Sequence, residues 1–71
     1  MPRFFSSRDI IRVLEHHGFV FVSQRGSHVK YRRKRDDIAF TAIIPANKKG
    51  IPSGTFRSIL RQSQLSENDF K

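Results

Sequence analysis

The sequence predicts an α+β fold in which the elements follow the order α-β-β-β-α. Two segments, one near each end of the chain, carry apolar residues at helical spacing. Between them lie three short segments that alternate in polarity or are rich in β-branched and aromatic residues. Because short links join these segments, we expect a three-stranded antiparallel sheet with both helices on one face.

The first helix is predicted over residues 6–17. Ser6 and Asp9 form an S-x-x-D sequence, in which the serine caps the helix and the aspartate reaches back to the cap. Gly18 follows, and glycine suits the left-handed position just beyond a helix end. Arg12 and Glu15 lie outside the apolar stripe of this helix. The stripe consists of Ile10, Val13, Leu14 and His17.

Three strands are predicted over residues 19–24, 27–33 and 37–44. Gly26 lies between the first two, where it is free to take a positive φ in a turn. Residues 34–36 are the expected turn between the second and third strands. The three segments therefore predict a meander of neighbouring antiparallel strands.

The second helix is predicted after a proline and a loop. Pro45 ends the third strand, because proline has no N–H for the ladder, and residues 46–52 form the loop. Ser53 or Thr55 is the expected cap of the helix. Its apolar stripe consists of Phe56, Ile59 and Leu60. A second S-x-x-D sequence at residues 66–69 predicts a last short turn that places Phe70 on the core.

The length and composition indicate a small intracellular domain. The 71 residues are expected to form one domain over residues 1–71. The chain has no cysteine, which excludes a disulfide or a thiolate-held zinc, so its seven Phe and one Tyr are expected to supply much of the core. The longest apolar run, residues 19–22, is far shorter than the roughly 20 residues that span a bilayer. Since the start of the chain also lacks the apolar core of a signal peptide, we expect a cytoplasmic protein with no membrane partner.

The charge of the chain predicts an anionic partner. Fourteen basic and six acidic residues give 14 − 6 = +8, with an isoelectric point near 11.2. Such a balance favours phosphate polymers or other anionic surfaces. The carboxylate pair of Asp36 and Asp37 is ordinary for a hairpin turn, so we expect no metal there. We also expect no small-molecule cofactor.

The segment QRGSHVKYRRKR, residues 24–35, carries one histidine among basic side chains and contains no acidic residue. Side chains alternate along a strand, so His28, Lys30 and Arg32 share one face. Val29 and Tyr31 share the other face and are the better core candidates. By spacing alone, His28 is a solvated surface residue, a contact for phosphate, or a general acid or base acting on a polyanion. This pattern favours binding of nucleic acid and only suggests its cleavage.

Besides Lys30 and Arg32, three further cations are candidates for contacts with RNA. Arg25 adjoins the turn before the second strand. Lys48 and Lys49 precede the start of the second helix, whose N–H groups and dipole favour an anion. A phosphate resting there and a pair of solvated loop lysines are both consistent with this position.

Three stretches of the chain resemble a known family: SSRDIIRVLEHHGF, QRGSHVKYR and IPSGTFRSILRQSQLSENDF. Together they are similar to the HicA family of RNA-cleaving toxins from HicA/HicB toxin–antitoxin pairs. The similarity runs from Ser6 to Phe70, in the right order and spacing. It implies a single HicA-like toxin domain with the fold of a double-stranded-RNA-binding domain. It also implies an mRNA interferase that needs no metal and is neutralised by a HicB-like antitoxin.

The resemblance also assigns the catalytic residue. The family's catalytic histidine lies in a Gly-Ser-His triplet, which corresponds here to residues 26–28, so the resemblance implies that His28 is catalytic. Many members carry a second histidine in a Pro-x-His sequence after the third strand, where this chain has Asn47. Asn47 can form hydrogen bonds but cannot exchange protons near neutral pH. Two rival functions use the same basic face: a non-catalytic RNA-binding module of the double-stranded type, and a protein that docks an acidic partner.

Overall fold

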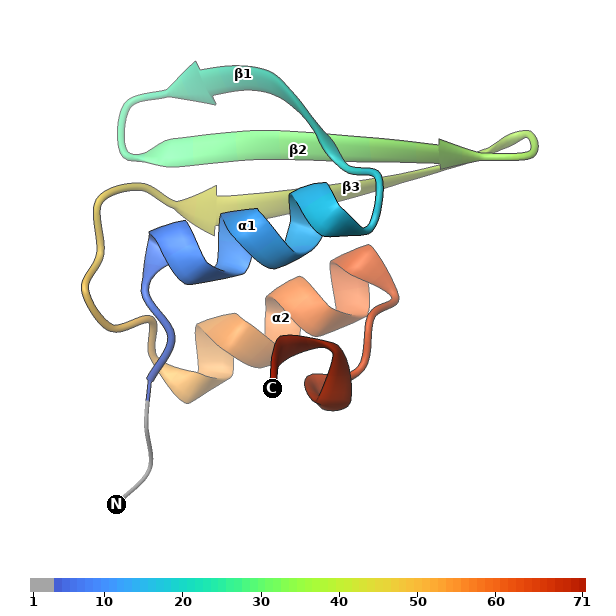
Figure 1. The fold of residues 1–71 in the computed structure, drawn as a ribbon. Coiled ribbons are helices and arrows are strands. Elements are labelled where there is room, and N and C mark those ends of the chain that lie inside the picture. Colours follow the sequence, from blue (N-terminus) through green and yellow to red (C-terminus); the bar gives the residue numbers. More distant parts are fainter. Residues whose placement is uncertain (1–3) are drawn as a thin grey trace.

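The computed structural model describes residues 4–71 and has the predicted order of elements (Figure 1). The start of the chain, on which the expectation of no signal peptide partly depends, lies outside this range. The elements are α1 (Ser7–His16), β1 (Val20–Arg25), β2 (His28–Arg35), β3 (Ile38–Pro45), α2 (Ser53–Ser63) and the short 3-10 helix η1 (Glu67–Phe70). Within residues 4–71, no helix has both the length and the apolar character needed to cross a membrane.

Helix α1 begins and ends where its sequence predicts. The Ser6 hydroxyl accepts a hydrogen bond from the Asp9 N–H at 3.1 Å, and the Asp9 carboxylate accepts one from the Ser6 N–H at 3.3 Å. These two bonds satisfy backbone donors that the first helical turn leaves without partners. Gly18 follows the helix with φ of 90°, in the region that glycine adopts most easily. The predicted capping box is therefore confirmed.

The sheet has the order β1-β2-β3 and both pairs are antiparallel, as predicted. Between β2 and β3 the register is regular from His28, opposite Pro45, to Arg35, opposite Ile38. The prediction of a turn at residues 34–36 was wrong, because the strands run further and only Asp36 and Asp37 lie between them. Asp36 takes φ of 56°, a left-handed conformation that aspartate tolerates better than most residues.

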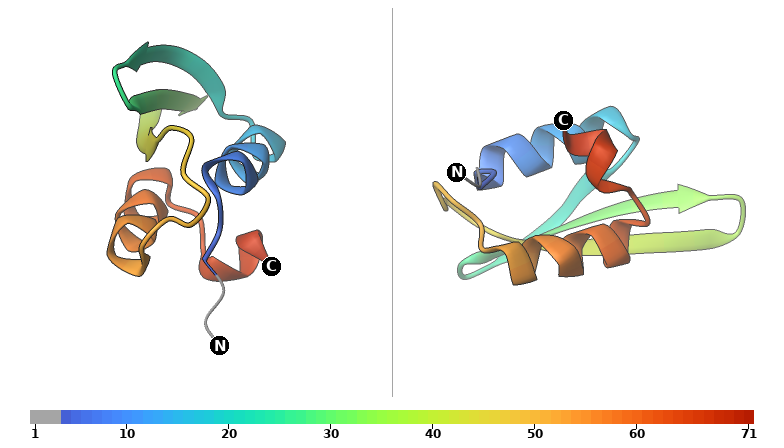
Figure 2. Two further views of the ribbon diagram at one scale, coloured as in Figure 1. Left: turned by 90° about the vertical axis from the view of Figure 1, so that its left-hand side faces the viewer. Right: turned by 90° about the horizontal axis from the view of Figure 1, so that it is seen from below.

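One face of the sheet is buried by the two helices (Figures 1 and 2). Val29 and Tyr31 of β2 lie opposite Ile44 and Ala42 of β3, and all four side chains belong to the core. Both helices contribute to the same cluster, through Ile10 and Leu14 of α1 and Ile59 of α2. The prediction that both helices pack on one face, with Val29 and Tyr31 inward, is therefore confirmed.

Helix α2 protects the outer edge of β3. The Gln62 side-chain oxygen accepts a hydrogen bond from the Ile43 N–H at 2.9 Å, which satisfies a donor at this edge. The prediction of a Ser53 or Thr55 cap was wrong: Pro52 is the N-cap residue, and no side chain bonds to this helix start. Proline's restricted φ suits the entry into a helix without a capping side chain.

The end of the chain closes the core beside α1 and α2. The Ser66 N–H donates to the Asp69 carboxylate at 2.8 Å, as its S-x-x-D sequence predicts. Phe70 is buried, and its ring lies 5.1 Å from that of Phe56 and 6.0 Å from that of Phe5, measured between centroids. The predicted placement of Phe70 on the core is confirmed.

Strand β1 differs from the expectation that aromatic residues lie in the core. All six of its residues are exposed, including Phe21 at 56%. The pairing with β2 shifts between Phe21 and Ser23, so Val22 is an extra residue, or bulge, in β1. Much of the core is instead aliphatic, and Phe19, just before β1, is buried under the Arg33 guanidinium.

Candidate functional site

His28 is the first residue of β2 and is held by backbone contacts on both sides. It lies opposite Arg25 of β1 and Pro45 of β3. The turn of Gly26 and Ser27 precedes it, with Gly26 at φ of 60°. The Ala46 N–H donates a hydrogen bond of 2.7 Å to the Ser27 carbonyl, which ties this turn to the end of β3. The position of His28 therefore depends on all three strands.

The exposed His28 side chain lies on the face of the sheet opposite the helices, as the alternation of β2 predicts. It helps to line a cavity of about 590 Å³, here called the His28 cleft. The lining residues are Ser23, Gln24, Arg25, His28, Val29, Lys30 and Ile43. Two of the predicted cations, Arg25 and Lys30, are thus beside the histidine, and no acidic side chain lines the cleft. This arrangement favours a bound anion.

The other predicted cations lie outside the His28 cleft. Arg32 is exposed on the same face of β2, further along the strand and opposite Val20 and Thr41. Lys48 and Lys49 belong to the loop after β3 and line a different cavity. Of the five predicted RNA contacts, Arg25 and Lys30 thus line the His28 cleft, Lys48 and Lys49 line the other cavity, and Arg32 lines neither.

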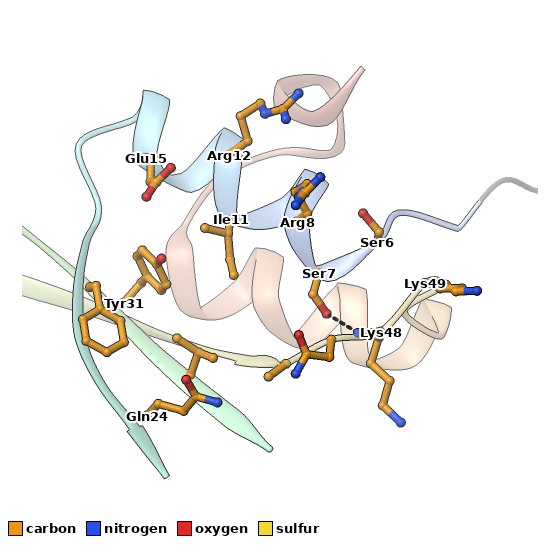
Figure 3. Close-up of a pocket in the computed structure, with 14 residues that line it drawn as sticks. Ser6, Ser7, Arg8, Ile11, Arg12, Glu15, Gln24, Tyr31, Lys48 and Lys49 are labelled. Carbon is orange, nitrogen blue, oxygen red and sulfur yellow. Dashed lines mark hydrogen bonds between the residues drawn. The ribbon is translucent and has the colours of Figure 1, made fainter. Parts of the chain in front are cut away.

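The second cavity, here called the α1–β1 groove, has a volume of about 760 Å³ and lies between α1, the sheet and the loop after β3 (Figure 3). Its cations are Arg8, Arg12, Lys48 and Lys49, and its apolar surface comes from Ile11, Phe21, Val29, Tyr31 and Ala46. Glu15 is the acidic residue in its lining. Both cavities include Gln24 and Val29, so the His28 cleft and the groove adjoin at the end of the β1–β2 hairpin.

Ser7 fixes the loop after β3 against the start of α1. Its N–H donates to the Lys48 carbonyl and its hydroxyl accepts from the Lys48 N–H, both at 2.9 Å. The same hydroxyl donates to the Pro45 carbonyl. These bonds bring Arg8 into the same groove as the loop lysines. Sequence analysis missed Arg8 and Arg12 as companions of Lys48; the one available signal was that Arg12 lies outside the apolar stripe of α1.

Asn47, at the position where the resemblance leads us to expect a histidine, lines the α1–β1 groove. It does not line the His28 cleft. Its φ is 57°, a left-handed conformation in which asparagine is enriched. The residue therefore suits the backbone of the loop, apart from any role of its side chain.

Tyr31 borders the α1–β1 groove and is expected to make the free energy of unfolding vary with pH in the alkaline range. Burial, and then the charge of Glu15, raise the pKa of Tyr31 above its ordinary value of 10.0. The unfolded chain thus releases this proton at lower pH than the folded chain. We expect the resulting contribution to stability to be complete below about pH 10 and lost as pH rises through the folded pKa. Tyr31→Phe should lack this loss, as measured by urea denaturation of both proteins from pH 8 to 11.

Acidic and histidine side chains are scattered. Within residues 4–71, no three His, Cys, Asp or Glu side chains are grouped so that they could hold a metal ion. Asp36 and Asp37 lie in the β2–β3 turn, at the opposite end of β2 from His28. His17 contacts Asp69 at 3.6 Å, between the end of α1 and η1. None of these groups lines the His28 cleft.

Comparison with protein families supports the resemblance read from the three stretches. The family model described as the HicA toxin of bacterial toxin–antitoxin systems matches residues 7–65. The chain belongs to the HicA toxin family. The match includes the Gly-Ser-His triplet, the strands and the whole of α2. It covers every residue that lines the His28 cleft and every residue that lines the α1–β1 groove except Ser6. No curated protein shows a significant match to the chain.

Proposed function

We propose that this HicA family member is the toxin of a type II toxin–antitoxin system and a cytoplasmic endoribonuclease that cleaves mRNA without a metal. In this proposal His28 is the general acid or base, and a HicB-like antitoxin neutralises the protein. The observation that carries it is the exposed His28 side chain, which shares a cleft with Arg25 and Lys30 and with no carboxylate. Family membership supports the role as a toxin.

The chemistry follows from the nucleophile that RNA itself carries. The 2′-hydroxyl attacks the adjacent phosphorus, and an imidazole can take the proton of this hydroxyl because it gains and loses protons near neutral pH. A bond forms between the 2′-oxygen and phosphorus, and the bond to the 5′-oxygen breaks. The 5′-oxygen takes a proton from solvent. The products are a 2′,3′-cyclic phosphate and a 5′-hydroxyl.

The cations of the His28 cleft supply electrostatic stabilisation. The transition state carries extra negative charge on the phosphoryl oxygens, which Arg25 and Lys30 can stabilise from positions beside the histidine. Arg32, on the same face, and Lys48 and Lys49, beyond Pro45, would hold neighbouring phosphates of the strand. Tyr31, an aromatic residue near His28, faces the core, so this side chain offers RNA bases little stacking surface and we expect weak sequence preference.

The decisive experiment is incubation of the purified protein with single-stranded RNA in EDTA, followed by analysis of the fragment ends. We expect cleavage with 2′,3′-cyclic phosphate and 5′-hydroxyl ends. Fragments with 5′-phosphate ends would contradict the mechanism, because they require water as the nucleophile. RNA binding without cleavage would instead favour the non-catalytic RNA-binding module.

A further inference from the structure

The free edge of β1 is the least protected backbone edge of the sheet. In the sheet of residues 4–71, β1 is a terminal strand and pairs with β2 alone. The other terminal strand, β3, is covered in part by Gln62 of α2. An uncovered strand edge presents N–H and C=O groups that another chain can bind. The edge of β1 therefore offers a template for an additional strand.

The side chains of this edge are also unusually apolar for an exposed segment. Val20, Phe21 and Val22 are consecutive and are 63%, 56% and 40% exposed. Natural proteins protect exposed edges with charged residues, proline or bulges. Strand β1 has a bulge at Val22 but no charged residue before Arg25. An apolar patch on the surface commonly marks an interaction site. The bulge at Val22 contributes to this exposure, because it interrupts the alternation that would otherwise send every second side chain inward.

The α1–β1 groove lies directly beside this edge and combines apolar surface with positive charge. Phe21 packs edge-on against Tyr31, with 6.0 Å between the ring centroids and an interplanar angle of 74°. Figure 3 shows Arg8 and Arg12 projecting from α1 at the opposite side of the groove from Tyr31. A ligand that suits this surface has an apolar side chain for the groove and acidic groups for its rim.

We propose that an extended segment of the antitoxin, carrying apolar and acidic side chains, pairs with the free edge of β1 as a fourth strand. One of its apolar side chains occupies the α1–β1 groove beside Phe21, and its carboxylates contact Arg8 and Arg12. A polypeptide fits better than RNA, because a strand has the alternating donors and acceptors that match the edge of β1. The inference rests on the antitoxin partner of the proposed function and does not depend on ribonuclease activity.

This binding mode would also explain neutralisation. Arg25, at the end of β1, lies opposite His28, and Gln24 lines both the groove and the His28 cleft. A segment bound along β1 therefore ends beside the catalytic histidine. The antitoxin would exclude RNA from the His28 cleft, because it would cover the neighbouring edge of β1 and neutralise the positive charges there.

Hydrogen exchange of the intact protein, alone and in complex with the antitoxin, tests the inference directly. We expect amide exchange within residues 20–25 to slow at least tenfold in the complex, because outward N–H groups gain partners. Unchanged exchange in β1, with protection confined to other elements, would overturn the proposal. This readout is independent of whether the protein cleaves RNA.

Three variants separate the possible ligands. Phe21→Ser and Arg12→Glu are expected to weaken antitoxin binding at least tenfold in titration calorimetry. Ile38→Ser is the matched control, because Ile38 is also an exposed apolar strand residue, at 59%, but lies beyond the reach of β1. It should bind the antitoxin like the parent, and Phe21→Ser and Ile38→Ser should both retain the parent's affinity for RNA. If Phe21→Ser weakened RNA binding and left antitoxin binding unchanged, the groove would be a nucleic-acid site and the proposal would be wrong.

Discussion

Replacing His28 with alanine is expected to lower the rate of RNA cleavage by about 10²- to 10⁴-fold, the usual contribution of a positioned acid or base. The side chain lies in the His28 cleft and, among residues 4–71, forms no hydrogen bond or ion pair that His28→Ala would disrupt. Both the fold and the affinity for RNA should therefore be largely unchanged. Single-turnover cleavage in EDTA, with RNA binding measured in parallel, separates loss of chemistry from loss of binding.

His16→Ala is the matched control for this measurement. His16 is exposed at the end of α1 and lines neither the His28 cleft nor the α1–β1 groove. Its replacement should leave cleavage at the rate of the parent. Equal cleavage by the parent and His28→Ala would remove His28 from the mechanism, while leaving the role of the chain as a toxin untouched.

Replacing Ile44 with alanine is expected to destabilise the fold by about 2–5 kcal/mol. Ile44 is fully buried, lies opposite Val29 in the sheet, and belongs to the cluster that receives both helices. Shortening this side chain to alanine leaves a cavity between the sheet and the two helices. At typical values per residue, 71 folded residues have a total stability of roughly 4–11 kcal/mol, so this loss is a large share. Urea denaturation followed by circular dichroism measures it.

Val22→Ala provides the contrast. Val22 and Ile44 are both β-branched residues of predicted strands, but Val22 is an exposed bulge residue of β1 whereas Ile44 is buried. We expect its replacement to change the free energy of unfolding by no more than about 0.5 kcal/mol. A cost similar to that of Ile44→Ala would mean that β1 is covered in solution, for example by self-association.

The features of this protein that its sequence alone determines are those encoded within a few neighbouring residues. The capping box of Ser6 and Asp9 and the alternation of β2 involve spacings of three and two residues, so both were predictable. The alternation also places His28 on the open face, once Val29 and Tyr31 are known to point inward. The resemblance then identified the triplet that carries His28.

The turn between β2 and β3 and the start of α2 were less predictable. Basic residues at 34–35 suggest a turn, yet they are tolerated at the exposed end of a hairpin, where Asp36 accommodates the left-handed conformation. At α2, a proline replaces the expected capping side chain. In both cases local preferences are weak compared with the gain from longer strand pairing or from packing of the helix.

Only the tertiary structure decided which apolar and basic residues act together. The run of residues 19–22 has the composition of a core strand, but Phe19 alone is buried, because β1 bulges at Val22 and its outer residues remain uncovered. The groove joins Arg8 to Lys48 because Ser7 bonds to a loop that is about forty residues away in the chain. Periodicity depends on neighbours in sequence, whereas burial and the grouping of charges depend on which distant elements pack against a surface.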